Sequence, residues 1–425
     1  MYHQPTHFLM PSYTHPLDIA IFVIFLFVTL AVGLGYGRQT KTIQDYALGG
    51  KNFATPILTA TIVATWTSGW VLALILEKVY TEGLYFIIAI TGDALALLFI
   101  GRFLASRVGE FLNNVSVAET MGKLYGKRVR IITAIAGISK AIGIVAVQFK
   151  VSAKVMGLLF GLQGTQAAFL AAAIVILYST FGGIRAVTFT DAFQFITFGI
   201  FIPILALVVW NSVKDSISFM DLLITDPSFS FTALIRTPTR WGACLSLMLF
   251  FTVSGMGPAL FQRISMARNV KQAKQAFTNA FILYMGIILF MVWLAVLVRA
   301  SSPNVEPSLL LNYVINRYAY VGLKGGVTVG IMAMVMSTAD SYINTASVLF
   351  THDIIGVLRI KFTRPIIVAR AFAFSLGVLG LCLALVMDDL LEIALLVASL
   401  YIPMITAPLL LALFGFRTSK RVLSY

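Results

Sequence analysis

The chain has 425 residues, of which 59% are hydrophobic and only 11% are charged. Soluble domains carry about 25% charged residues, so the composition excludes an ordinary soluble protein. A formal net charge of +14 is compatible with nucleic-acid binding. However, the basic residues fall in short segments between apolar runs, as the positive-inside rule of membrane proteins predicts. Both cysteines, Cys244 and Cys382, lie within apolar runs and indicate no disulfide framework.

Apolar runs of bilayer length recur along the chain and predict an all-α polytopic membrane protein. We predict about eleven spans, over 17–37, 53–77, 84–105, 130–160, 165–181, 188–211, 238–260, 276–298, 325–350, 366–387 and 389–414. The segment before Pro16 has no Lys or Arg and lacks the basic region of a signal peptide, so we expect the first span to be retained.

The distribution of basic residues predicts the orientation of the chain. With the N-terminus outside, the inner segments hold 19 Lys and Arg and the outer segments hold six. This asymmetry favours an outer N-terminus and a cytoplasmic C-terminus. We expect a multi-pass protein of the cell membrane, of the kind found in the bacterial inner membrane.

Two of the predicted spans are interrupted by small and polar residues, at 64–70 and at 251–258. An unwound backbone at such a point offers free carbonyl groups to a ligand. A single break would favour close helix packing as its explanation. Paired breaks in corresponding segments indicate a transporter site between inverted repeats. We expect one transmembrane domain over 1–425, with an extra helix at 17–37, a first repeat at 53–211 and a second at 238–414.

The run over 325–350 carries an unusual number of polar side chains for a membrane span. Helical spacing puts one group of hydroxyls on a single face: Ser337, Thr338, Ser341 and Thr345. An adjacent face holds Asp340, Asn344 and Ser347. Such groups are costly in hydrocarbon unless they face a protein interior, a cavity or an ion. Because hard cations prefer oxygen ligands, this span is predicted to form half of a sodium site.

The segment Gly182–Gln194 resembles the signature of the sodium:solute symporter family, which includes the sodium/proline, sodium/pantothenate and sodium/glucose cotransporters. The run 336–341 with the later Asn344 resembles the family's eighth core helix, and 262–268 is similar to an inner loop of the family. The resemblance covers roughly 17–414. It implies a LeuT-type fold of five plus five inverted helices with one preceding helix, and sodium-coupled import of a small organic solute.

Carried over by position, the resemblance implies a sodium site made of the backbone carbonyls of Ala64, Thr67 and Met334 and the hydroxyls of Ser337 and Thr338. Five neutral oxygens can replace the hydration shell of a monovalent cation without a formal charge, so binding stays reversible. The alternative for the two hydroxyls is a hydrogen bond back to a carbonyl of the preceding turn.

Asp191 matches a family carboxylate on the cytoplasmic release path of the cation. Its alternative role, compatible with the first, is that of an acidic residue near the start of a helix. In the sodium/proline branch an Asp aligns with Trp66, which argues against proline as the solute. Our candidates for solute binding are Trp66, Ser68, Gly69, Phe250 and Ser254. A packed or lipid-facing role for Trp66 stays open.

Three lysines lie in the span 130–160. Lys150 and Lys154 are near its outer end, where their ammonium groups can reach the interface. Lys140 is deeper and requires an interior partner, with Asp93 and Asp340 as candidates. The alternative is that Lys140 binds an anionic solute.

We therefore predict a secondary active symporter that works by alternating access. Its partners are a small solute, sodium and the lipid bilayer, with no nucleic acid and no cofactor besides the coupling ion. The sequence has no nucleotide-binding loop, metal cluster or catalytic triad, so an enzyme is not expected. A non-transporting sensor derived from a symporter is the main alternative, and a channel is a weaker one. The chain ends at Tyr425, before the last one or two helices of typical family members. We expect its core to suffice for transport, with a shortened inactive or regulatory form as the alternative.

Overall fold

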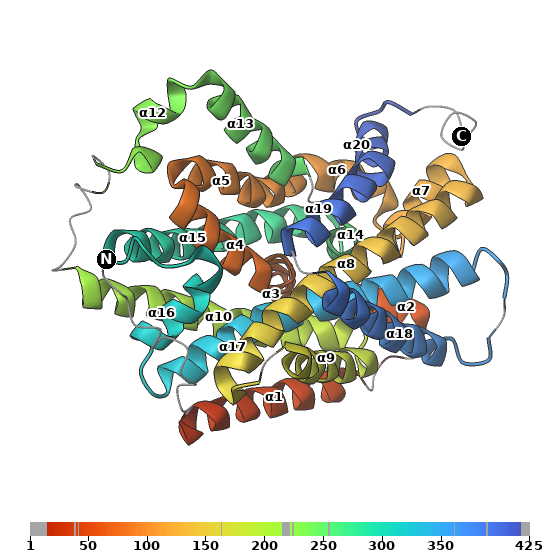
Figure 1. Cartoon of the computed structure of the whole chain (residues 1–425). Coiled ribbons are helices and arrows are strands. Elements are labelled where there is room, and N and C mark those ends of the chain that lie inside the picture. Colours follow the sequence, from red (N-terminus) through yellow and green to blue (C-terminus); the bar gives the residue numbers. More distant parts are fainter. Residues whose placement is uncertain are drawn as a thin grey trace.

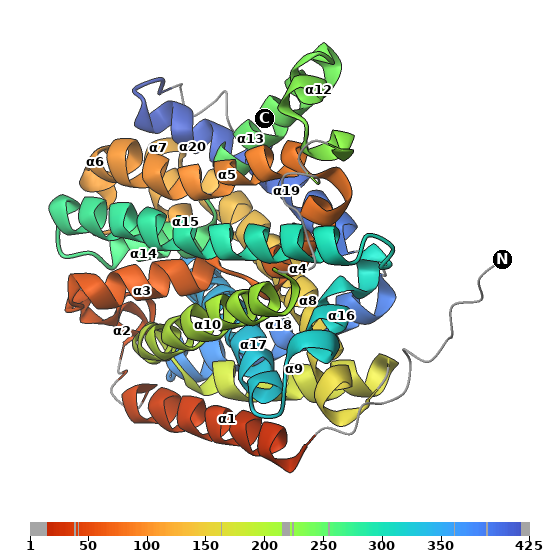
Figure 2. The same ribbon diagram turned by 90° about the vertical axis from the view of Figure 1, so that its left-hand side faces the viewer.

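A computed structural model describes residues 15–37, 40, 42–162, 164–214, 222, 225–253, 256–360, 362–387 and 390–417. All regular structure in these ranges is helical, and none of them contains a β-strand. Figures 1 and 2 show a bundle of helices, with α1 (Pro16–Gly37) along one edge and α8 (Lys127–Phe160) and α17 (Leu323–Val348) crossing its interior.

The remaining helices of the first half are α2 (Ile43–Leu48), α3 (Thr55–Trp66), α4 (Gly69–Glu82), α5 (Leu84–Phe99), α6 (Ala105–Arg107), α7 (Val117–Tyr125), α9 (Gly164–Phe181) and α10 (Ile184–Val213). Those of the second half are α12 (Phe231–Ile235), α13 (Pro238–Val253), α14 (Pro258–Ser265), α15 (Val270–Ser301), α16 (Leu310–Tyr318), α18 (Pro365–Val386), α19 (Leu390–Tyr401) and α20 (Ala407–Leu413). Short π-helical segments extend α5 over Ile100–Leu104 and α17 over Leu349–Ile355, and join α19 to α20 over Ile402–Thr406.

The described part of the chain contains eight helices long and apolar enough to cross a membrane, or ten when each of two bent pairs counts as one span. The bent pairs are α3–α4, with an angle of 55°, and α13–α14, with an angle of 48°. Both bends fall where the sequence predicted interrupted spans. The prediction of a polytopic all-α membrane protein is therefore confirmed.

Helix α17 is the most deeply buried long helix of the bundle. Every side chain from Leu323 to Val348 is buried except that of Tyr342, which is partly exposed. The helix packs against α8 and α10. A Cβ atom on Gly326 would lie 2.1 Å from the ring of Phe201, so this glycine is what lets α10 approach so closely.

Both ends of α17 are attached to other helices by buried carboxylates. At its start, Oδ1 of Asp18 in α1 accepts hydrogen bonds from the amides of Gly322 (2.8 Å) and Gly325 (2.7 Å). Amides at a helix N-terminus have no partner within the helix, and a carboxylate also interacts favourably with the helix dipole there. At the other end, Nε of Arg130 in α8 donates to Oδ1 of Asp353 at 2.7 Å.

The predicted end of the span 238–260 is too early, because α14 continues to Ser265. Pro258 at the first turn favours helix initiation, since its φ angle is already helical. The polar side chains that suggested a loop are buried instead. Nε2 of Gln262 donates to the carbonyl of Ala47 at 2.8 Å, and Arg263 is fully buried. A hydropathy pattern predicts that such polar residues are exposed to water. In the structure they are buried and have hydrogen-bond partners inside the protein.

Candidate cation and solute site

The break between α3 and α4 releases backbone carbonyls at the end of α3. The amide of Thr67 makes the last helical bond, to the carbonyl of Val63 at 2.8 Å. Ser68 then adopts an extended backbone (φ −93°, ψ 154°), and its hydroxyl accepts from the amide of Val71 at 3.2 Å to start α4. In a continuous helix the amides of Ser68 and the next residue would bond to the carbonyls of Ala64 and Thr65.

Two hydroxyls of α17 lie against these released carbonyls. Oγ of Ser337 is 2.8 Å from the carbonyl oxygen of Ala64 and 3.1 Å from that of Met334. Oγ1 of Thr338 donates to the carbonyl of Thr65 at 3.3 Å. Thus α3 and α17, which are about 270 residues apart in sequence, meet through backbone and hydroxyl oxygens in the middle of the bundle.

Of the five residues predicted to bind sodium, Ser337 has its hydroxyl oxygen in contact with the predicted carbonyl oxygens of both Ala64 and Met334. Thr338 contacts the carbonyl of Thr65, one residue after Ala64. Thr67 lies at the break, and its buried Oγ1 has no hydrogen-bond partner among the described residues. A set of neutral oxygens with an unsatisfied hydroxyl beside it matches the ligand preference of a hard monovalent cation.

Asp191 of α10 lies beside this set in a fully buried polar cluster. Its Oδ2 accepts from Thr61 Oγ1, from Thr65 Oγ1 at 3.4 Å and from Arg263 Nη2 at 3.2 Å. The same guanidinium nitrogen donates to Thr65 Oγ1 at 2.9 Å and to Ser341 Oγ at 2.6 Å. The cluster connects α3, α10, α14 and α17. Asp191 Oδ1 has no hydrogen-bond partner in the described part of the chain.

A cavity of about 370 Å³ begins beside the same oxygens. Thr65 and Thr338 line its inner part, and its lining continues along α4 to Lys78 and Glu82 near the end of that helix. Its size is within the usual range of small-molecule sites, about 300–1,000 Å³. The cavity therefore connects the α3–α4 break with one face of the bundle.

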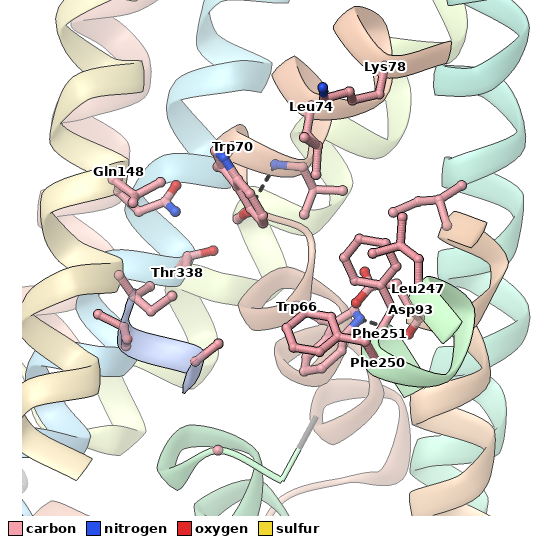
Figure 3. A pocket seen from close by; sticks show the side chains of 18 of the residues that line it. Trp66, Trp70, Leu74, Lys78, Asp93, Gln148, Leu247, Phe250, Phe251 and Thr338 are labelled. Carbon is pink, nitrogen blue, oxygen red and sulfur yellow. Dashed lines mark hydrogen bonds between the residues drawn. The ribbon is translucent and has the colours of Figure 1, made fainter. Parts of the chain in front are cut away.

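Three of the predicted solute-binding residues, Trp66, Ser68 and Phe250, line this cavity. Figure 3 shows Trp66 and Phe250 gathered with Phe251 on one side, opposite Thr338. Trp66 is held there because its Nε1 donates to the backbone carbonyl of Asp93 at 3.2 Å. It is therefore packed inside the protein and does not face lipid.

The two other predicted solute-binding residues are placed differently. Gly69 is not among the lining residues, and a Cβ atom there would lie 2.7 Å from Val335 Cγ2, so it allows α4 and α17 to pack closely. Ser254 lies outside the described residues.

Lys140 also lines the cavity, with its ammonium group 4.6 Å from the ring centroid of Tyr401. One of its two expected partners, Asp93, instead accepts a hydrogen bond from Tyr284 Oη at 2.5 Å. Among the ion pairs of the described residues, none involves Lys140.

Comparison with known proteins identifies the family. The model of the sodium:solute symporter family matches residues 46–421. The chain belongs to the sodium:solute symporter family. The predicted resemblance to this family is thereby confirmed. Because symporters of this family transport solutes and catalyse no covalent reaction, the prediction that the chain is not an enzyme is confirmed as well.

Several transporters and symporters are similar to this chain. The high-affinity choline transporter 1 of Caenorhabditis elegans is 25% identical over 88% of this chain and 69% of its own length. The sodium/sialic acid symporter NanT of Aliivibrio fischeri is 25% identical, covering 79% of this chain and 69% of NanT. The sodium/proline symporter of Haemophilus influenzae is 27% identical, covering 79% and 70% of the two chains.

Solved structures support the fold. A Na⁺-coupled sialic acid symporter in a substrate-bound, outward-open state matches with a TM-score of 0.81 and 19% identity, over 95% of this chain and 88% of that one. MhsT in complex with L-phenylalanine matches with a TM-score of 0.56 and 15% identity, over 82% and 88% of the two chains. The LeuT-type fold of this sodium:solute symporter is therefore confirmed. None of these similarities supports the alternative of a non-transporting sensor.

The sequence analysis missed two parts of the site. Arg263 was assigned to a loop, although its spacing of five residues after Pro258 matches the sodium/proline branch of the family. That spacing, within a helix that starts at the proline, is the signal that could have placed Arg263 inside the bundle. Tyr284, the partner of Asp93, lies in an apolar run and gave no signal.

Proposed function

We propose that this symporter binds one sodium ion between α3 and α17 and imports it together with a small organic solute held in the adjacent cavity. The cation ligands are the carbonyls of Ala64, Thr67 and Met334 and the hydroxyls of Ser337 and Thr338. The observation that carries the proposal is the contact of Ser337 Oγ with the carbonyl of Ala64, a carbonyl released by the helix break, at 2.8 Å. Sodium binding would replace this hydrogen bond with ion–oxygen contacts from both helices.

The proposed orientation follows the distribution of basic residues, with the N-terminus outside and the C-terminus in the cytoplasm. In this orientation the end of α4, and therefore the open end of the cavity, faces outward. The opposite route is closed by the cluster of Asp191, Arg263, Thr65 and Ser341. Asp191 would attract the departing cation inward once the contacts of Arg263 in this cluster open. The domain would consist of the two repeats 53–211 and 238–414, which rearrange around the site.

Coupling supplies the energy for accumulation of the solute. One sodium ion that moves inward gains about 2.3 kcal/mol per 100 mV of membrane potential, in addition to the free energy of its concentration gradient. Because the proposed ligands carry no formal charge, sodium binding remains weak enough for release in each cycle. The solute binds next to the cation because Thr65 and Thr338 border both the cavity and the proposed cation site.

The test is sodium binding by the purified protein in detergent, measured as the shift of its unfolding temperature with NaCl and, in parallel, with LiCl and N-methyl-D-glucamine chloride. We expect stabilisation by sodium in the wild type. Ser337→Ala and Thr338→Ala each remove one proposed ligand and should weaken sodium binding by at least about tenfold, as expected for a lost interaction with a charged group of about 1.5–3 kcal/mol.

Thr328→Ala provides a matched control on the same helix. Thr328 is also buried, and its hydroxyl donates to the carbonyl of Lys324 at 2.6 Å, one turn earlier. Its removal should lower stability without changing the sodium dependence. Unchanged sodium dependence in both Ser337→Ala and Thr338→Ala would refute the site, and equal stabilisation by N-methyl-D-glucamine chloride would refute sodium binding altogether.

A further inference from the structure

Two ionisable side chains in the deeper part of the cavity, Lys140 and Asp93, have no function in the proposed sodium site. Lys140 belongs to a single face of α8 that lines the cavity together with Ile144, Val147 and Gln148. Asp93 comes from α5 and lies with Trp66 and Phe250 on the side opposite Gln148 (Figure 3). The cavity therefore has the lysine side chain of α8 on one side and the carboxyl group of Asp93 on the other.

Lys140 lies deep in the membrane protein. Its side chain is 7% exposed, and a lysine near the centre of a membrane helix costs about 2.5–3.5 kcal/mol on insertion scales. Its ammonium group lies over the ring of Tyr401, and Lys140 takes part in none of the ion pairs of the described residues. Gly257 lets the ammonium group pack closely against α14, because a Cβ atom there would lie 3.3 Å from Nζ, and the cavity provides open space on another side of Lys140. A buried cation with open space in front of it is suited to binding an anionic group.

Asp93 is positioned by its neighbours. Its Oδ2 accepts from Tyr284 Oη at 2.5 Å, and its backbone carbonyl accepts from Trp66 Nε1 at 3.2 Å. At the outer end of the cavity, Lys78 and Glu82 form an ion pair at 3.3 Å and thus compensate each other. Asp93 and Lys140 take part in no ion pair of this kind among the residues that the structure describes.

We infer that the solute is a small zwitterion whose carboxylate binds Lys140 and whose ammonium group faces Asp93. This inference rests on the proposed function, because it assumes that the cavity is the solute site. The aromatic rings of Trp66, Phe250 and Phe251 would then contact its apolar part. A simple carboxylate would compensate Lys140 but place a second negative charge in the cavity with Asp93. A neutral sugar would leave both charges without a counter-charge, which is unfavourable away from water.

The experiment is a stability screen of the full chain in detergent with saturating sodium. The probes are the neutral amino acids, the matching amino alcohols without a carboxylate, the matching carboxylic acids without an amine, and hexoses. We expect that at least one amino acid raises the unfolding temperature more than its two partial analogues do, and that hexoses have no effect. Stabilisation by a hexose or an amino alcohol, equal to or above that of every amino acid, would overturn the inference.

Variants assign the two charges. Lys140→Met should weaken binding of the selected amino acid by about 30-fold or more. This factor is the lower end of the loss of affinity expected when one partner of a desolvated charge pair is removed. Lys140→Arg should retain part of the affinity. Asp93→Asn should bring the affinity for the amino acid close to that for the matching carboxylic acid. Lys154→Met is the matched control, because Lys154 is an exposed lysine of α8 outside the cavity.

Failure of this inference is distinguishable from failure of the sodium site. Lys140→Met should keep the sodium-dependent stabilisation of the wild type, since Lys140 is not a proposed cation ligand. If Lys140→Met binds the amino acid as tightly as Lys154→Met does, the assignment of the carboxylate to Lys140 is wrong. If sodium does not raise the unfolding temperature of the wild type, the cation site is refuted instead.

Discussion

The buried pair of Asp191 and Arg263 allows a quantitative test of how the inner side of the site is held together. The two side chains are fully buried, with Oδ2 and Nη2 at 3.2 Å. At an effective dielectric constant of 20, two unit charges at this distance attract by about 5 kcal/mol. Desolvation offsets part of this attraction. Removing only one partner leaves the other charge uncompensated and should lower the free energy of unfolding by about 3–5 kcal/mol.

The double mutant separates the pair from the rest of the cluster. Arg263→Met and Asp191→Asn should each be strongly destabilising, whereas the double mutant should be less destabilised than the sum by about 2–3 kcal/mol. The free energies are measured by detergent-induced unfolding in mixed micelles, followed by the fluorescence of the five tryptophans. The half-buried pair of Arg299 and Asp226, at 2.8 Å, serves as the control and should show a coupling below about 1 kcal/mol. Additive effects of Asp191→Asn and Arg263→Met would show that the two charges do not stabilise each other.

Two further predictions concern acid stability and helix packing. Burial raises the pKa of the Glu119 carboxyl, but hydrogen bonds from His352 and from the amide of Val115 outweigh it and lower the pKa to about 2, from its ordinary value of 4.5. A lowered pKa in the folded state stabilises the fold above pH 4.5, and this stabilisation is lost as the pH falls toward 2. Glu119→Gln lacks the titrating carboxyl, so its unfolding temperature should change less between pH 4.5 and 2 than that of the wild type. An equal change in both proteins would contradict the assignment. Gly92→Ala should be destabilising by about 1–3 kcal/mol, because its Cβ would lie 2.1 Å from the carbonyl oxygen of Met248, whereas Gly286→Ala meets no atom within 4 Å and should be neutral or stabilising in the same unfolding assay.

The sequence was sufficient to predict the broad features of the fold, because hydrophobic runs and helix breaks depend on local composition. The break near Ser68 and the hydroxyls of Ser337 and Thr338 were recognised for this reason. Contacts between distant side chains could not be predicted in the same way. Arg263 and Thr65 are 198 positions apart, and hydropathy alone assigns a charged residue at the end of an apolar run to water. Only the packing of α14 into the bundle reveals that Arg263 has interior acceptors.

The carboxylates at the two ends of α17 have a consequence for the transport cycle. Asp18 fixes the start of the helix to α1, and Asp353, just after its end, pairs with Arg130 of α8. We expect a helix fastened in this manner to move little relative to α1 and α8, so that Ser337 and Thr338 keep their positions relative to these two helices during the cycle. In the proposed cycle the ion is therefore released when the carbonyls of α3 move away from two hydroxyls that do not.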